Sequence, residues 1–225
     1  MKNAIGLALV IILAIIVTSC RMTFAPDEYS AEEKELKLAS NAGKPDPAAL
    51  SRLGEIYLLR NDRKRALGFL RMAVKADPDY PPPYFFMGKI HFFDKDNDKG
   101  IEEFGIFQKK MDRVYKNDPA LEEFYTKSLM YINYLHVTIK RYDDVLAGYK
   151  KIVRISPNNQ KAHYNLAVCY YNFFHNLPMA YTELQKVIDL NTDRRLSDKA
   201  RFFIDYVRNN PDSRYVSDFS FLDKD

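Results

Sequence analysis

Two groups of residues have the types and spacing that could do chemistry. The first is Asp94, Asp96 and Asp98, whose alternating carboxylates are oxygen donors of the kind that Ca²⁺ prefers. A calcium loop of this register needs glycine where Lys99 stands and a bidentate glutamate where Gly105 stands. Asp and Asn also favour turns. We therefore interpret the segment as a turn between two helices and expect no metal and no other cofactor.

The second group is Cys20 together with the residues before it. Lys2 supplies a positive charge, an unbroken apolar run extends from Ala4 to Val17, and Thr18 and Ser19 are small. This is the pattern of a secretory signal peptide. The run is shorter than the ~20 residues that a spanning helix prefers, although a membrane-spanning anchor is the alternative.

Val17 and the three residues that follow it resemble the bacterial lipobox, in which an apolar residue and two small ones precede a cysteine. The resemblance implies that residues 1–19 are removed and that Cys20 is acylated on its thiol and amino group. Several acyl chains, each CH₂ contributing about 0.8 kcal/mol, make a lasting anchor. Residues 20–29 would then be a tether. Arg21, rather than Asp, at the second mature position resembles sorting to the outer membrane, facing the periplasm of a bacterial envelope.

The rest of the chain has no pattern of a catalytic or nucleic-acid site. The 225 residues carry a net charge of +4, with basic and acidic residues mixed along the chain, so we expect no nucleic-acid partner. There is no Gly-x-Ser-x-Gly, phosphate loop or dinucleotide fingerprint. The four histidines lack partners at metal-ligand spacing, and Cys169 lies in an apolar run that predicts a buried, inert thiol. The sequence therefore predicts that the protein is not an enzyme.

A pattern with a period of 34 residues must position any functional surface. Large and small residues recur at fixed spacing, beginning with Leu53, Gly54, Tyr57, Ala66 and Pro78. This spacing resembles the tetratricopeptide repeat, a helix–turn–helix unit. The resemblance implies an all-α protein, an α-α superhelix or solenoid of about four repeats with flanking capping helices.

The repeat pattern also divides the chain. Ser30 and Glu33 have the spacing of a capping box, which predicts where the first helix begins. Extra residues separate the second and third units, and Ala120 to Tyr125 are expected to extend the following helix. We expect the tail to pack on the array, a free recognition segment being the alternative. The predicted parts are a repeat domain at 30–208, with a half-repeat at 30–40, units at 47–80, 81–114, 126–159 and 160–193, a capping helix at 194–208, and the tail at 209–225.

Small residues are needed where the two helices of a unit cross closely. Gly54 and Gly88 hold this place in the first helix of units one and two. In unit three, Asn133 and Val145 stand where small residues are expected. The two helices of unit three should therefore lie slightly farther apart.

Each unit consists of a first helix, helix A, and a second helix, helix B. Helix A lines the inner face of such a superhelix and carries the family's ligand-contacting places. In this sequence many of these places hold aromatic residues, bordered by lysines. Exposed aromatic rows are costly in water, and such residues dominate binding hot spots. We interpret Phe86, Phe93 and Tyr131 as core residues instead. The predicted partner-binding groove consists of Phe85, Lys89, Phe92, Lys127, Met130, Tyr134, Lys161, Tyr164, Asn165, Val168 and Tyr171.

These features together predict a membrane-anchored scaffold or adaptor that binds a protein or peptide partner and helps assemble a cell-envelope complex. The arrangement resembles pilotin lipoproteins and the repeat lipoproteins of barrel-assembly machinery. The alternative is a ligand-binding accessory lipoprotein of a periplasmic solute-transport system, in which the aromatic residues hold a small hydrophobic molecule. An open groove favours the scaffold and a closed pore favours the accessory protein. No pattern in the sequence selects an oligomeric state.

Overall fold

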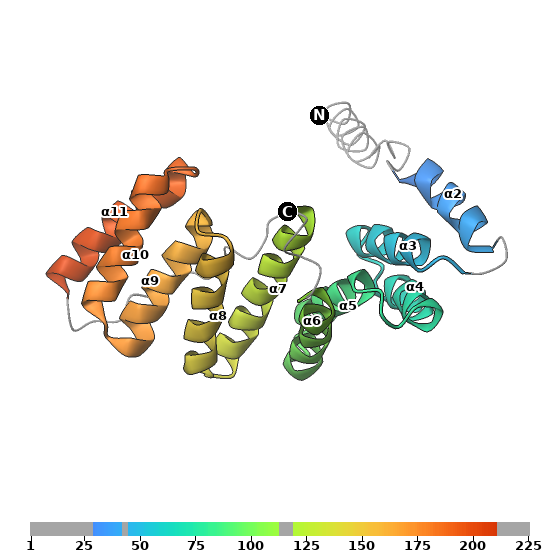
Figure 1. Cartoon of the computed structure of the whole chain (residues 1–225), viewed down its shortest axis with the longest axis horizontal. Helices are drawn as coiled ribbons and strands as arrows, with labels where there is room; N and C mark the ends of the chain where they lie inside the picture. Colours follow the sequence, from blue (N-terminus) through green and yellow to red (C-terminus); the bar gives the residue numbers. More distant parts are fainter. Residues whose placement is uncertain (1–28, 42–44, 113–118, 211–225) are drawn as a thin grey trace, which may run out of the picture.

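The computed structural model describes residues 29–41, 45–112 and 119–210, and all regular structure within these ranges is α-helical (Figure 1). The predicted signal peptide, Cys20 and nearly all of the tail lie outside the described residues. In chain order the described helices are α2 (Ser30–Asn41), α3 (Pro47–Leu59), α4 (Arg63–Ala76), α5 (Pro82–Phe93), α6 (Asn97–Met111), α7 (Pro119–Thr138), α8 (Tyr142–Ile155), α9 (Gln160–Phe174), α10 (Leu177–Leu190) and α11 (Arg194–Asn209).

The helices form antiparallel hairpins that stack in chain order along the long axis of the molecule (Figure 1). The hairpins α3–α4, α5–α6 and α9–α10 fall within three of the units expected from the sequence, and α7–α8 covers the third unit except that α7 begins earlier, at Pro119. Each described helix packs against the next, and α3 also contacts α5, α5 contacts α7 and α9 contacts α11. The predicted all-α superhelix is confirmed.

The turn between the two helices of a unit has a recurring backbone conformation. Asn61, Lys95 and Lys140 occupy the same position of units one, two and three, and all three have positive φ angles near 60°. Unit four has one extra residue, and there the left-handed residue is His175. Few residues other than glycine adopt the left-handed region unless the surrounding turn requires it. Its recurrence at matching positions shows that the hairpins share one geometry.

Side-chain caps fix where most of the helices begin. A carboxylate or amide oxygen in the residue before the helix accepts a hydrogen bond from a backbone N–H of the first turn, which satisfies one of the donors left open there. The capping residues are Asp46, Asp62, Asp96, Asn159, Asn176 and Asp193.

Glycine allows the two helices of units one and two to approach each other closely. A Cβ atom at Gly54 would come 2.6 Å from the Leu70 side chain, and one at Gly88 would come 2.8 Å from the Phe104 ring. Unit three makes room differently, because the buried Asn133 of α7 lies against Gly148 of α8. The sequence pattern singled out Asn133 but not its partner glycine.

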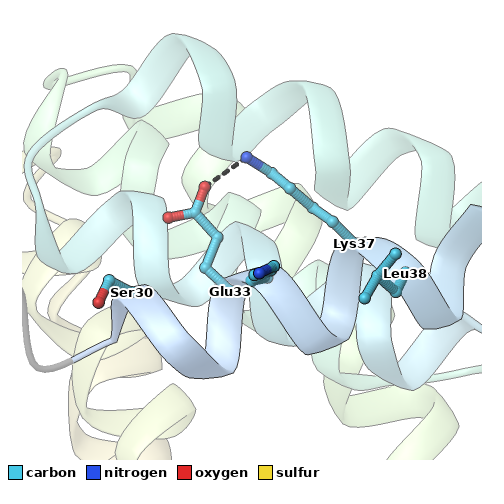
Figure 2. Close-up of a pocket in the computed structure, with 5 residues that line it drawn as sticks. Ser30, Glu33, Lys37 and Leu38 are labelled. Carbon is cyan, nitrogen blue, oxygen red and sulfur yellow. Dashed lines mark hydrogen bonds and ion pairs between the residues drawn. The ribbon is translucent and has the colours of Figure 1, made fainter.

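The N-terminal helix α2 is joined to α3 mainly by polar contacts. Figure 2 shows Glu33 and Lys37 on successive turns of α2, with their side chains directed toward each other. Glu33 also accepts hydrogen bonds from the Tyr57 hydroxyl and from Arg60. The capping-box prediction gave the correct start of α2 but the wrong role for Glu33, whose carboxylate is directed to the neighbouring helix instead of back along its own.

Apolar residues hold the other end of the stack. Leu196, Ala200, Phe203 and Val207 of α11 are buried, and the helix packs against α10 and α9 as the first helix of a further unit would. Its opposite side is exposed and charged. The helix therefore covers the last apolar surface of the array, as a solenoid requires.

Candidate functional site

Two adjacent hollows lie along helices α3, α5 and α7. The first, of about 270 Å³, is lined by residues that include Leu58, Leu59 and Phe93. The second, of about 470 Å³, is lined by residues that include Phe93 again and Tyr134. Because Phe93 borders both hollows, they form one surface across units one to three. We call this surface the A-helix face, and its principal residues are Leu58, Leu59, Lys89, Phe92, Phe93, Tyr134 and Thr138.

Aromatic packing fixes the centre of the A-helix face. The ring of Phe92 lies 5.5 Å from that of Phe93, 5.0 Å from that of Tyr131 and 5.2 Å from that of Tyr134, centroid to centroid. All three pairs meet edge to face, which is a favourable arrangement for aromatic rings. Tyr131 is in turn stacked on the buried Phe104. The half-exposed rings of the face are therefore held in place by rings in the core.

The A-helix face is apolar with a positive border. Lys89 lies with its ammonium 5.9 Å from the centroid of the Tyr131 ring. Glu55 and Arg63 also line the first hollow, but each is engaged in an ion pair, Glu55 with Arg52 and Arg63 with Asp94. Among the described residues Lys89 has no ion-pair partner of its own. The face thus offers aromatic surface together with a cation suited to an acidic or carbonyl group.

The structure places five of the predicted groove residues in the interior, which corrects their assignment to an open surface. Phe85 is enclosed by aromatic rings, among them Phe107 and Phe124. In unit four the rings of Tyr164 and Tyr171 pack against Phe203 of α11. Helices of the next unit complete this burial, because α7 packs against Phe85, and α11 packs against Tyr164 and Tyr171. The five buried residues are Phe85, Tyr164, Asn165, Val168 and Tyr171.

The other predicted groove residues are partly or fully exposed. Lys89, Phe92 and Tyr134 come together on the A-helix face. Lys127 and Met130 are partly exposed on α7, where Lys127 forms an ion pair with Glu123. Lys161 is exposed on α9. None of these last three borders either hollow.

Phe93 is the residue whose assignment changes most. Sequence reasoning placed it in the core with Phe86 and Tyr131, and those two are indeed buried. Phe93 itself is 43% exposed and joins the two hollows. Leu59, 58% exposed, holds the same position in unit one. Both fall at a ligand-contacting place of the repeat, so the signal was present in the sequence but was outweighed by the apolar character of Phe93.

The residues considered for metal or thiol chemistry are used structurally. Asp96 caps α6, and Asp94 pairs with Arg63. Burial raises the pKa of the Cys169 thiol to about 12, which disfavours the reactive thiolate. Burial also lowers the pKa of His91 and of His136. In the described ranges no group of three or more histidine, cysteine or acidic residues is placed to hold a metal ion.

The length and apolar character of the described helices bear on whether they could span a membrane. Within residues 29–41, 45–112 and 119–210, no helix combines the length and the apolar character needed to cross a bilayer. The apolar run that precedes Cys20 lies outside these ranges.

Comparison with known proteins identifies the fold. No protein-family model and no curated protein matches the chain. A solved structure of MamA is similar, with a TM-score of 0.57 and 16% identity over 75% of this chain and 89% of that one. MamA from Desulfovibrio magneticus RS-1 gives a TM-score of 0.54 and 18% identity over 76% of this chain and 100% of that one. At such low identity the likeness concerns the fold alone: the chain is an all-helical superhelix of the tetratricopeptide-repeat type.

Proposed function

We propose that this protein is a lipid-anchored scaffold of the bacterial cell envelope, which binds a peptide segment of a partner protein on its A-helix face. The observation that carries the proposal is the shared border of the two hollows at Phe93. It gives a surface that spans three repeats, long enough for an extended or helical peptide.

The composition of the A-helix face supports a protein partner. Leu59 and Phe93 expose about half of their side chains to solvent, although burying such side chains is favourable. Aromatic residues at the centre of an interface commonly carry much of the binding energy. Phe92 and Tyr134 are already fixed by ring contacts, so little side-chain entropy is lost when a partner covers them.

A crosslinking experiment on intact membranes tests the A-helix face. A photo-reactive residue in place of Phe93 should crosslink one defined partner. In a pull-down of that partner, a Leu59→Ala/Phe93→Ala variant should recover at least about tenfold less of it than the parent protein, the effect of losing about 1.4 kcal/mol. Both side chains are half exposed, so the double substitution should leave the fold intact. The matched control is Phe202→Ala on α11, where the aromatic ring is also exposed. Equal recovery of the partner by the parent protein, the double variant and the Phe202→Ala control would exclude the A-helix face as the binding site.

The anchor is tested separately. The lipobox-like residues before Cys20 support cleavage and acylation at that cysteine, with placement in the outer membrane facing the periplasm as the expected result. Cys20→Ser should give a full-length, unacylated protein in whole-cell mass spectrometry. Continued acylation of that variant would refute the anchor without affecting the proposal for the A-helix face.

A second candidate function is the ligand-binding accessory lipoprotein of a periplasmic transport system. The observation in its favour is a separate, almost entirely apolar hollow of about 340 Å³, which includes Phe107, Met111, Leu121 and Phe124 in its lining. Its size and character suit a small hydrophobic molecule. Mass spectrometry of solvent extracts from the purified protein should find such a molecule, and Phe124→Asp should remove it. Extracts that contain no such molecule would count against this candidate.

A further inference from the structure

Among the described helices, α4 has the largest excess of basic over acidic residues. The helix contains five basic residues and no acidic one, whereas the whole chain has a net charge of only +4. Lys64, Gly68, Arg71, Met72 and Lys75 are all exposed. Their spacing places them on one face of the helix. We call these five residues the α4 face.

The opposite side of α4 faces the core of the array. Ala66, Leu70 and Ala73 are buried completely, and the helix packs against α3 and α5. The orientation of α4 is therefore fixed by packing, and the α4 face is held outward. In Figure 1 this helix lies at the N-terminal end of the stack.

The cations of the α4 face form no ion pair with a described residue, although Asp62 interacts electrostatically with Lys64. Arg63 and Arg65 of the same helix form ion pairs with Asp94 and Asp62. Among the described residues, by contrast, none forms an ion pair with Lys64, Arg71 or Lys75. The acidic group that acts electrostatically on Arg71 is Glu103 of α6, at a distance beyond an ion pair.

Other helices with many basic residues are built differently. Helix α11 also carries five, but two aspartates alternate with them, and Arg201 and Arg208 pair with those aspartates. Such alternation is typical of a solvated helix surface. The absence of acidic residues on α4 is therefore a specific feature of that helix.

We infer that the α4 face docks on an anionic phospholipid surface. Lysine and arginine side chains next to a membrane that contains anionic lipid are attracted to it without needing a shaped pocket. Met72, 51% exposed among the cations, provides an apolar side chain that can enter the headgroup region. Gly68 lies at the centre of the face, and a Cβ atom there would meet nothing within 4 Å. The helix can thus approach a flat surface closely, which suits a bilayer better than a ridged protein partner.

Docking through α4 would orient the array on the membrane. The A-helix face is formed by helices A, whereas α4 is the helix B of unit one. Contact with lipid through α4 leaves the A-helix face open to a partner. The inference does not depend on what binds that face, nor on acylation of Cys20.

A fluorescence experiment on the full-length protein tests the inference. In a Cys20→Ser background, Gly68→Cys carries an environment-sensitive thiol dye at the centre of the α4 face, and the buried Cys169 does not compete for the label. The protein is reconstituted in vesicles of phosphatidylcholine alone or of equal parts phosphatidylcholine and phosphatidylglycerol. The dye should brighten and shift to the blue only in the anionic vesicles. In 1 M salt, where the screening length falls to about 3 Å, the change should be reversed. A dye at Phe202→Cys, on exposed α11, should not respond.

Charge variants make the test specific. Replacing Lys64, Arg71 and Lys75 by glutamine should lower the ratio of docked to free protein by about a hundredfold, because each basic residue near an anionic surface contributes about a factor of five. The control with the same loss of charge replaces Arg194, Arg195 and Lys199 of α11 by glutamine and should keep the response.

Two results would overturn the inference. One is a dye at position 68 that does not respond to anionic vesicles, whether or not an added acidic protein changes its emission. The other is an equal loss of response in both charge variants. Circular dichroism of each variant confirms that the helices are intact, so that a loss of docking is not a loss of fold.

Discussion

The side chain of Asn133 on α7 occupies the space directly above Gly148 on α8. A Cβ atom placed at Gly148 would come 1.9 Å from Oδ1 of Asn133, closer than any real contact. Asn133 stands where the first two units have glycine, and it is buried. The small residue needed at this helix crossing has therefore moved from helix A to helix B of unit three.

Gly148→Ala should consequently destabilise the protein. The added methyl group must displace the buried Asn133 amide, and overpacking of this kind costs about 1–3 kcal/mol. Gly68→Ala is the matched control, since it is also in a helix but faces open space. It should stabilise the protein by about 0.5–1 kcal/mol, because alanine loses less backbone entropy in a helix than glycine. Urea denaturation measures both, and a shift of the same sign for the two variants would contradict the account.

Stability above neutral pH should be limited by Glu103. Burial, with a smaller contribution from Glu102, raises the pKa of Glu103 to about 7 from its ordinary value of 4.5, and one of its carboxyl oxygens is buried without a hydrogen bond. A pKa raised in the folded state stabilises the fold below pH 4.5, and this stabilisation is lost as the pH rises through 7.

Glu103→Gln should therefore raise the free energy of unfolding at pH 8 by about 1–2 kcal/mol, a value reduced to allow for partial exposure. At pH 4 the variant and the parent should be similar. Glu102→Gln, an exposed neighbour on the same helix, should keep most of the pH dependence. Parallel stability curves for Glu103→Gln and the parent protein between pH 4 and 8 would refute the assignment.

Attachment of α2 to the array should fail first in acid. Hydrogen bonds from Lys37, Tyr57 and Arg60 lower the pKa of Glu33 to about 2. A lowered pKa contributes stability that is present above the ordinary value of 4.5 and is lost as the pH falls toward 2. Hydrogen exchange measured at decreasing pH in that range should show α2 losing protection before α11. At neutral pH, Glu33→Gln should speed exchange in α2 about tenfold and leave α11 unchanged. Simultaneous loss of protection in both helices would contradict this prediction.

Unit four depends on a buried polar pair. His163 Nδ1 lies 2.5 Å from Glu183 Oε2, and His163 Nε2 lies 2.7 Å from the carbonyl oxygen of Pro157. Glu183→Ala leaves the ring without its carboxylate partner in a dry environment and should cost about 3 kcal/mol. Lys186→Ala, which removes the half-exposed partner of the same carboxylate, should cost less than about 1 kcal/mol. Thermal unfolding should separate the two variants clearly, and equal effects would argue against a buried pair.

The regular parts of the fold could be predicted because they depend on local spacing. Gly54 and Gly88 mark close helix crossings in the sequence, and those crossings are present. The backward extension of the third unit's first helix was also predicted, and α7 begins at Pro119. Gly148 could not be predicted from unit three alone, because its importance comes from contact with Asn133 across the hairpin.

The candidate site was predicted only in part, for a related reason. Lys89, Phe92 and Tyr134 lie on the A-helix face, whereas Phe85 and Tyr171 are buried. The Phe85 ring is enclosed by rings of α6 and α7, and the Tyr171 ring packs against Phe203 of α11. Coverage by the next repeat depends on how neighbouring units pack, and no spacing within one unit describes that.

The sequence by itself determined the hairpins. Helical periodicity, Asx caps and recurring small residues act over short stretches of the chain, so the residues of one unit are enough to specify its two helices and the turn between them. Only the tertiary structure decided which aromatic rings are buried between units and which, like Phe93, remain on the surface. The physical reason is that solvent exposure is a property of the whole stack. A ring on helix A reaches water only where the helices packed alongside leave it uncovered.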